Sequence, residues 1–249
     1  MTTQMHLAAQ YLAAAGISFV EKKEDDSHTN LGFSTSEKSM FTHPLDKEGH
    51  TLSLNYQHFT LEWNSKSSKK SLRLDGTTHS EILKWIHERA VEATLEKPFQ
   101  YDLHYELPYT TITDDFTFKL HDVARLRELT NFRILAQLTL ETFLENQQLK
   151  SGIRTWPHHF DTGAFVSLDD NSGLTIGLGL AIPDTMIDDY YFYMSAYKGH
   201  DGLDTSNLSS LTNGKWYNEG FKGAVLPVTG IDEITASTFF EEALAAYKK

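Results

Sequence analysis

The residues best able to do chemistry gather between Arg154 and Asp161, in the order Arg-Thr-Trp-Pro-His-His-Phe-Asp. An arginine can clamp a carboxylate through paired hydrogen bonds, a tryptophan can stack on a ring, and a histidine near an aspartate can form a hydrogen-bonded pair. We therefore expect Arg154, Trp156, His159 and Asp161 to bind a ligand. In this interpretation Arg154 is the anion clamp, and His159 and Asp161 supply hydrogen bonds.

The same segment admits two other interpretations. His158, His159 and Asp161 are weak candidates for metal ligands, because imidazole and carboxylate groups suit transition metals. His159 and Asp161 are also candidates for a catalytic dyad with a general base. Adjacent residues on a strand point to opposite faces, so His158 and His159 share one ion only if the chain turns at Pro157. A structural hydrogen-bonded pair is the simplest alternative.

A hairpin is predicted over about 160–182, directly after this segment. Two apolar runs flank the polar loop from Asp169 to Gly173, which has the length and composition that hairpins favour. The predicted register places Gly163 opposite Gly179 and Phe165 opposite Gly177, and it leaves this face nearly bare. Such a face lies under a packed helix or aromatic side chain, or it forms a depression for a ligand.

A third strand over Tyr190 to Tyr197 places Tyr191 and Tyr193 on one face. If this strand lies beside the hairpin, the phenols border the bare face, as aromatic side chains border small-molecule pockets. We then expect Tyr191 and Tyr193 to bind the ligand as well, with Tyr193 an alternative to Trp156 for stacking. Tyrosine also simply suits a half-exposed strand.

A second row of polar groups occurs earlier in the chain. Tyr101 to Leu107 alternates and predicts a strand with Asp102, His104 and Glu106 on one face. A half-solvated strand shows the same alternation, so this row is a weak ligand-binding signal. The glycines of the hairpin do not form a phosphate-binding loop, and no nucleophile elbow is present.

Composition limits the partners and the compartment. The formal charge of −12 disfavours nucleic acid as a partner, since lysine and arginine must neutralise phosphates. The absence of cysteine excludes disulfides and thiolate chemistry. We expect no signal peptide and no membrane span, and therefore a cytoplasmic protein. No particular cofactor is indicated, and self-association is compatible with the sequence.

The remaining elements predict an α+β fold, with mostly antiparallel sheets and three to four helices. Alternation over 51–63 slips in phase and indicates two strands or a bulge. Thr78 and Glu81 form a capping box that opens a helix to about Glu96. Further helices are expected at 3–15, ended by Gly16, at 122–147 and at 235–247. A single domain over 1–249 is expected, or two pseudo-halves at about 1–149 and 150–249.

These elements resemble a bacterial family known only as a domain of unknown function. The resemblance is carried by the Leu-x-Leu strand before Asp75-Gly76, the capped helix, the helix near 122–147, the Trp-Pro-His-His-Phe-Asp signature at 156–161, the Tyr-Phe-Tyr run at 191–193 and the closing helix. The polar loop at 200–218 departs from the family pattern. The resemblance implies one unit whose hallmark lies at 156–161, and it implies no activity.

The function is therefore not fixed by the sequence. The leading hypothesis is a protein that binds a small polar or aromatic ligand near Asp161. The alternatives are a metal-assisted hydrolase that uses His159 and Asp161, and a non-enzymatic interaction or scaffold protein.

Overall fold

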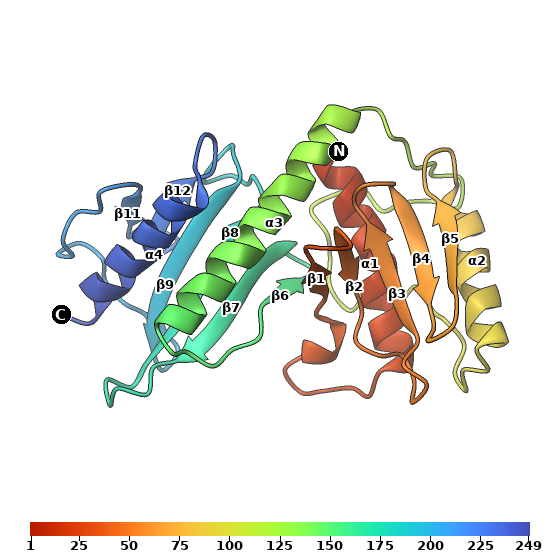
Figure 1. Cartoon of the computed structure of the whole chain (residues 1–249), viewed down its shortest axis with the longest axis horizontal. Helices are drawn as coiled ribbons and strands as arrows, with labels where there is room; N and C mark the ends of the chain where they lie inside the picture. The colour runs from red at the N-terminus through yellow and green to blue at the C-terminus, as the bar shows by residue number, and fades with distance from the viewer. The chain divides into compact units, whose positions relative to one another are not determined.

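The computed structural model describes residues 1–249 and contains four α-helices and two antiparallel sheets, which confirms the predicted α+β class (Figure 1). The chain forms two compact units. The first comprises residues 1–131 and 155–160, and the second comprises residues 132–154 and 161–249. No single cut near residue 149 separates them, because the chain passes between the units three times.

The first unit contains a sheet with the strand order β1-β2-β3-β4-β5. Its strands are β1 (Gly32–Ser34), β2 (Ser39–Phe41), β3 (Thr51–Asn55), β4 (Thr60–Asn64) and β5 (Lys69–Arg73). The phase slip predicted within 51–63 is a turn between β3 and β4. The side-chain oxygen of Asn55 accepts hydrogen bonds from the backbone N–H groups of Gln57 and His58, and Phe59 has a φ of 52°. The slip therefore marks a hairpin and not a bulge.

Helix α1 (Thr2–Phe19) packs against β3 and forms the centre of the first unit (Figure 1). Every residue from Met5 to Gly16 is buried, as expected for a core helix that is covered on all sides. The prediction that Gly16 ends this helix is wrong, because the helix continues to Phe19. Gly16 instead allows close packing, since a Cβ atom there would lie 2.9 Å from the carbonyl oxygen of His28. The short 3₁₀ helix η1 (Ser27–Thr29) includes that histidine.

Helix α2 (His79–Glu92) begins at the predicted capping box. The hydroxyl of Thr78 accepts a hydrogen bond from the backbone N–H of Glu81, and the Glu81 carboxylate accepts one from the backbone N–H of Thr78. Each bond satisfies a donor that the first helical turn would leave unpaired. The helix ends at Glu92, four residues before the predicted end at Glu96. The cap thus fixes the position of His79, the first residue of α2.

The predicted strand at Tyr101 to Leu107 is wrong, because no neighbouring strand pairs with this segment. The alternation nevertheless matches the burial of the side chains. The partly buried side chains are Tyr101, Leu103, Tyr105 and Leu107, and the exposed ones are Asp102, His104 and Glu106. The segment turns its aromatic and apolar side chains toward the interior of the first unit.

The second unit contains a sheet with the order β11-β12-β9-β8-β7, and β10 pairs with β9. The strands are β7 (Asp161–Ser167), β8 (Leu174–Ala181), β9 (Tyr191–Lys198), β10 (Asp201–Gly202), β11 (Lys215–Tyr217) and β12 (Gly223–Pro227). Gly163 pairs with Gly179, and Phe165 pairs with Gly177, in the register predicted for the hairpin. Strand β6 (Arg154–Trp156) carries the chain from the second unit back into the first.

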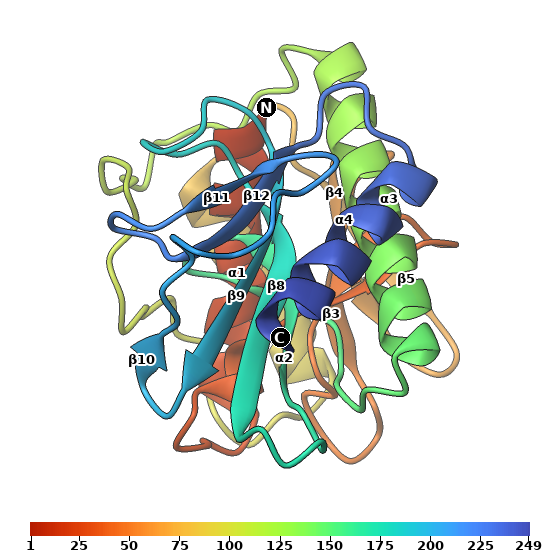
Figure 2. The ribbon, with the colours of Figure 1, turned by 90° about the vertical axis from the view of Figure 1, so that its left-hand side faces the viewer.

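One face of this second sheet packs against α4 (Glu233–Tyr247) and the part of α3 (Val123–Asn146) that follows Asn131 (Figure 2). Phe240 contacts Phe143 of α3 and Phe192 of β9, with ring centroids 5.5 Å apart in both pairs. The helices therefore cover the fully apolar face. The opposite face carries Asp161, the strand glycines and the tyrosines of β9. No helix of the structure is both long enough and apolar enough to cross a membrane.

Candidate functional site

The Trp-Pro-His-His-Phe-Asp segment combines a strand and a turn. Thr155 exchanges two backbone hydrogen bonds with Leu31, at 2.8 and 3.0 Å. Residues 157–160 then form a turn, in which the N–H of Phe160 donates to the carbonyl of Trp156 at 2.6 Å. The next strand begins only at Asp161. This turn changes direction between His159 and Asp161, so their predicted placement on one strand face does not apply.

Two buried polar side chains of α1 hold the turn in the first unit. Nε2 of His6 and Nε2 of Gln10 both donate to the carbonyl oxygen of Pro157, at 2.8 and 2.9 Å. The ring of Phe160 stacks on His6 with centroids 4.6 Å apart and nearly parallel planes. Buried polar groups need partners of this kind. The segment singled out by sequence therefore has a clear structural role in fixing α1.

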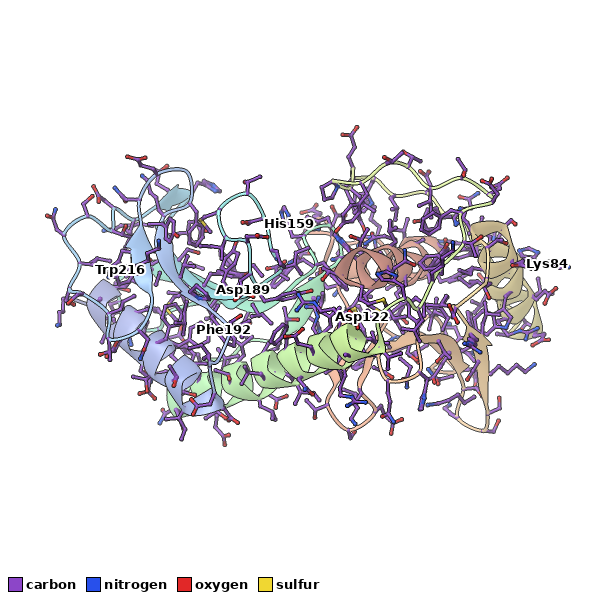
Figure 3. The ribbon with its side chains drawn as sticks, turned by 90° about the horizontal axis from the view of Figure 1, so that it is seen from above. Lys84, Asp122, His159, Asp189, Phe192 and Trp216 are labelled. Atoms are coloured by element: carbon purple, nitrogen blue, oxygen red, sulfur yellow. The ribbon has the colours of Figure 1, made fainter.

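Trp156 and His158 border a small hollow of about 170 Å³ in the first unit, together with Asp25, Asp26 and Tyr105. The His158 ring lies 5.5 Å from Tyr105 and 4.3 Å from His159, centroid to centroid. His159 is exposed (Figure 3). The turn thus brings the two imidazoles together, but no group of three or more His, Cys, Asp or Glu side chains in the chain could hold a metal ion.

The other predicted residues belong to the second unit, where Asp161 is bonded to a tyrosine. The hydroxyl of Tyr193 donates to Oδ2 of Asp161 at 2.5 Å, and the hydroxyl of Tyr191 donates to Oδ2 of Asp184 at 2.7 Å. Arg154 is half-buried at the start of β6. The second unit therefore groups Asp161 with Tyr193 and places Tyr191 on a different carboxylate. Trp156, His158 and His159 belong to the first unit.

Tyr193 also explains the bare face of the hairpin. Its hydroxyl would lie 3.0 Å from a Cβ atom built on Gly179, and the same Cβ atom would lie 2.3 Å from the carbonyl oxygen of Thr162. Burial raises the pKa of Tyr193 well above its usual value, and the Asp161 carboxylate adds to this shift. An aromatic side chain of the same sheet therefore occupies the space that the glycines leave, in accordance with one of the two predicted alternatives.

A larger pocket lies in the first unit, and the sequence did not indicate it. It has a volume of about 550 Å³ and is lined mainly by aromatic and apolar side chains. We call it the tyrosine pocket after three of its lining residues, Tyr101, Tyr105 and Tyr109. His79, at the start of α2, and Leu7 of α1 also line it. Small-molecule sites have this size and composition.

The polar groups of the tyrosine pocket are fixed by α1. The hydroxyl of Tyr105 donates to Oε1 of Gln10 at 2.7 Å, and the hydroxyl of Tyr109 lies 3.0 Å from Nδ1 of His6. Since Nε2 of His6 donates to Pro157, Nδ1 is the acceptor of the Tyr109 proton in the neutral ring. The pocket wall is therefore anchored to the same helix that holds the turn.

His79 is the one buried ionisable side chain that lines this pocket. Its exposed fraction is 6%, and its Nδ1 lies 2.6 Å from the hydroxyl of Tyr11, which is fully buried. Burial lowers the pKa of His79, an effect that the charge of Asp114 opposes, and burial raises the pKa of Tyr11. Both groups therefore stay neutral near pH 7.

Sequence reasoning missed His79 because its only local signal is the capping box. Thr78 and Glu81 predict where the helix begins, but they say nothing about the partner of His79. That partner, Tyr11, is 68 residues away in sequence. Only the packing of α2 on α1 brings the two side chains together.

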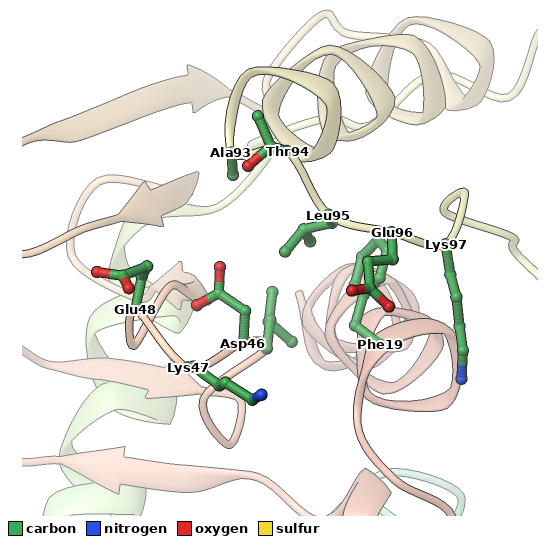
Figure 4. Close-up of a pocket in the computed structure, with 10 residues that line it drawn as sticks. Phe19, Asp46, Lys47, Glu48, Ala93, Thr94, Leu95, Glu96 and Lys97 are labelled. Carbon is green, nitrogen blue, oxygen red and sulfur yellow. The ribbon is translucent and has the colours of Figure 1, made fainter.

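A further hollow of about 390 Å³ in the first unit is lined by charged and apolar residues in similar proportion (Figure 4). Charges of both signs line it, among them Asp46, Lys47, Glu48 and Lys97. Asp46 already accepts two hydrogen bonds from His50, one from its ring and one from its backbone N–H. No buried polar group without a partner faces this hollow, so it is a weaker candidate than the tyrosine pocket.

No family model, curated protein or solved structure matches this chain.

Proposed function

We propose that this protein binds a small polar or aromatic molecule in the tyrosine pocket. The observation that carries the proposal is a volume of about 550 Å³, walled by tyrosines and leucines, into which the buried His79 opens. Ligand sites combine such apolar walls with a few polar groups that orient the ligand. Here those groups are the His79 imidazole and the tyrosine hydroxyls.

The predicted location near Asp161 is a different place for the same kind of ligand. On the second sheet, Tyr193 covers Gly179, and its hydroxyl is bonded to Asp161. A ligand on that face has to displace this bond, whereas the tyrosine pocket holds space without any rearrangement. This difference favours the tyrosine pocket, and the location near Asp161 stays a prediction for the same experiment to test.

The metal-assisted hydrolase has less support from the structure, and the interaction or scaffold protein stays a prediction. The hydrolase lacks a cluster of three or more ligand side chains. Ligand binding is the one hypothesis for which the structure supplies a suitably built volume.

The test is a thermal-shift screen of small aromatic compounds, nucleosides and organic acids, followed by binding measurements on variants. Thr111 is exposed at the pocket lining, so Thr111→Trp fills the pocket without disturbing the core. We expect Thr111→Trp to abolish binding and Asp161→Asn to leave it unchanged. Far-UV circular dichroism of each variant verifies that it is folded.

The reverse result is equally clear. Binding that Asp161→Asn abolishes and Thr111→Trp leaves intact would move the site to the second unit. Lys84→Ala, at an exposed position of α2, is the matched control and should bind as the unmodified protein does.

A further inference from the structure

The proton of Tyr11 has one possible acceptor. Tyr11 is fully buried, and its hydroxyl makes a single hydrogen bond, to Nδ1 of His79 at 2.6 Å. A buried hydroxyl that donates to nothing costs about 1–3 kcal/mol. The arrangement that uses this proton has the phenol donating and Nδ1 accepting.

This hydrogen bond fixes the tautomer of His79. A neutral imidazole whose Nδ1 accepts a hydrogen bond carries its proton on Nε2. Burial lowers the pKa of His79, which favours the neutral ring near pH 7. Nε2 makes no hydrogen bond within the protein, although the residue is buried and lines the tyrosine pocket. The pocket therefore receives an N–H donor.

Tyr101 supplies a second polar group beside this donor. Its ring packs edge-on against His79, with centroids 4.9 Å apart, and lies 5.1 Å from the Tyr11 ring. Its hydroxyl has no hydrogen-bond partner within the protein, and burial raises its pKa, so it keeps its proton. Two residues that each carry an unused donor thus have their rings in contact and line the same pocket.

The charges around the pocket select the ligand further. No lysine or arginine lines it, so an anion would lose its hydration without meeting a positive charge. Glu106 is the only carboxylate of the lining, and it is exposed. A cation would meet the N–H of His79, which repels it. A neutral ligand avoids both costs.

Resting on the proposed function, we infer that the tyrosine pocket binds a neutral carbonyl compound with an apolar body, whose oxygen accepts hydrogen bonds from Nε2–H of His79 and from the Tyr101 hydroxyl. Tyr11 is a positioning residue, because it sets the tautomer without touching the ligand. The leucines around the pocket contact the apolar body.

The tautomer is measured without any ligand. Two-bond ¹H–¹⁵N correlations of the imidazole rings in ¹⁵N-labelled protein show which nitrogen of His79 carries the proton, and His79→Phe assigns the signals. We expect a proton on Nε2 alone near pH 7, and a mixture of tautomers in Tyr11→Phe. A proton on Nδ1, or on both nitrogens, overturns the inference whether or not the pocket binds anything.

The ligand class is tested with three probes that share a phenyl ring: acetophenone, benzoate and benzylamine. Saturation-transfer NMR measures their binding. We expect acetophenone to bind at least tenfold more tightly than the two ions, because a buried charge without a partner costs more than a satisfied carbonyl. We expect Thr111→Trp to abolish its binding.

Variants separate the donor from the packing. His79→Phe alone strands the Tyr11 hydroxyl, so Tyr11→Phe combined with His79→Phe removes both partners and preserves the fold better. We expect this double variant to bind acetophenone about tenfold more weakly, in line with the loss of one hydrogen bond. Unchanged acetophenone binding in the double variant overturns the role of His79.

The outcomes distinguish the inference from the proposed function. Preferred binding of benzoate or benzylamine that Thr111→Trp abolishes keeps the pocket as a site and overturns the neutral-carbonyl class. If Thr111→Trp affects the binding of none of the three probes, both the class and the pocket are rejected.

Discussion

The hydroxyl of Tyr193 on β9 reaches across β8 to the carboxylate of Asp161 on β7, and Gly179 of β8 lies beneath it. This bond spans three strands and needs a residue without a side chain in the middle one. The glycines leave space on this face of the sheet, and the side chain of Tyr193 occupies that space. Stability experiments can test this relationship directly.

Gly179→Ala is expected to destabilise the protein by about 1–3 kcal/mol, the usual cost of forcing an extra methyl group into a packed site. Its Cβ atom would lie 2.9 Å from Cα of Gly163 and 3.0 Å from the Tyr193 hydroxyl. Urea unfolding measures the change. Gly152→Ala is the control, since a Cβ atom there meets nothing within 4 Å. Equal stability of the two variants would contradict the close approach.

Tyr193→Phe is expected to change the stability at alkaline pH. The pKa of Tyr193 is raised in the folded protein above its usual value of 10.0, so the unfolded chain loses this proton first. The free energy of unfolding therefore falls as the pH rises above about 10. The other buried tyrosines contribute in the same direction. We expect the phenylalanine variant to lose stability less steeply above pH 10, and identical slopes would rule out the role given to Tyr193.

The stability of the protein is also expected to fall in weak acid. Burial lowers the pKa of His79 below its usual 6.5, so the unfolded chain binds a proton that the folded protein resists. The contribution of His79 is complete above pH 6.5 and is lost as the pH falls through its folded pKa. The combined Tyr11→Phe and His79→Phe variant should show a shallower pH dependence between pH 7 and 5. A steeper slope in the variant would mean that the sign is wrong.

Thr78→Ala is expected to cost about 1 kcal/mol, because it removes the cap of α2. The Thr78 hydroxyl accepts the backbone N–H of Glu81, and its loss leaves that donor to water. Thermal unfolding reports the change, with Lys84→Ala on the same helix as control. Since α2 begins at His79, the uncapped variant should also broaden the His79 ring signals.

The hairpin shows what sequence alone can deliver. Alternation and loop length predicted the pairing of Gly163 with Gly179 and of Phe165 with Gly177, because each strand residue has one fixed partner once the turn is placed. What fills the bare face depends on the length and rotamer of Tyr193, two strands away. Local patterns do not encode that, so two alternatives stayed open.

The segment at Tyr101 to Leu107 shows what the sequence pattern could not predict. Its period of two correctly predicted which side chains face inward, but a strand also needs a hydrogen-bonded neighbour. Here the inward side chains pack on a helix, as the bond from Tyr105 to Gln10 illustrates. The same long-range packing forms the tyrosine pocket, so no local sequence motif predicts it.

The six residues from Thr155 to Phe160 have a consequence for how the chain can be made and cut. They complete the first unit, whose other segment ends 24 residues earlier in the sequence, at Asn131. During synthesis, Pro157 is added about 150 residues after His6 and Gln10. The first unit therefore cannot form these hydrogen bonds, and cannot complete its fold, until that part of the chain has been made. A fragment that stops at residue 149 would expose two buried polar groups of α1, and it should aggregate where the whole chain folds.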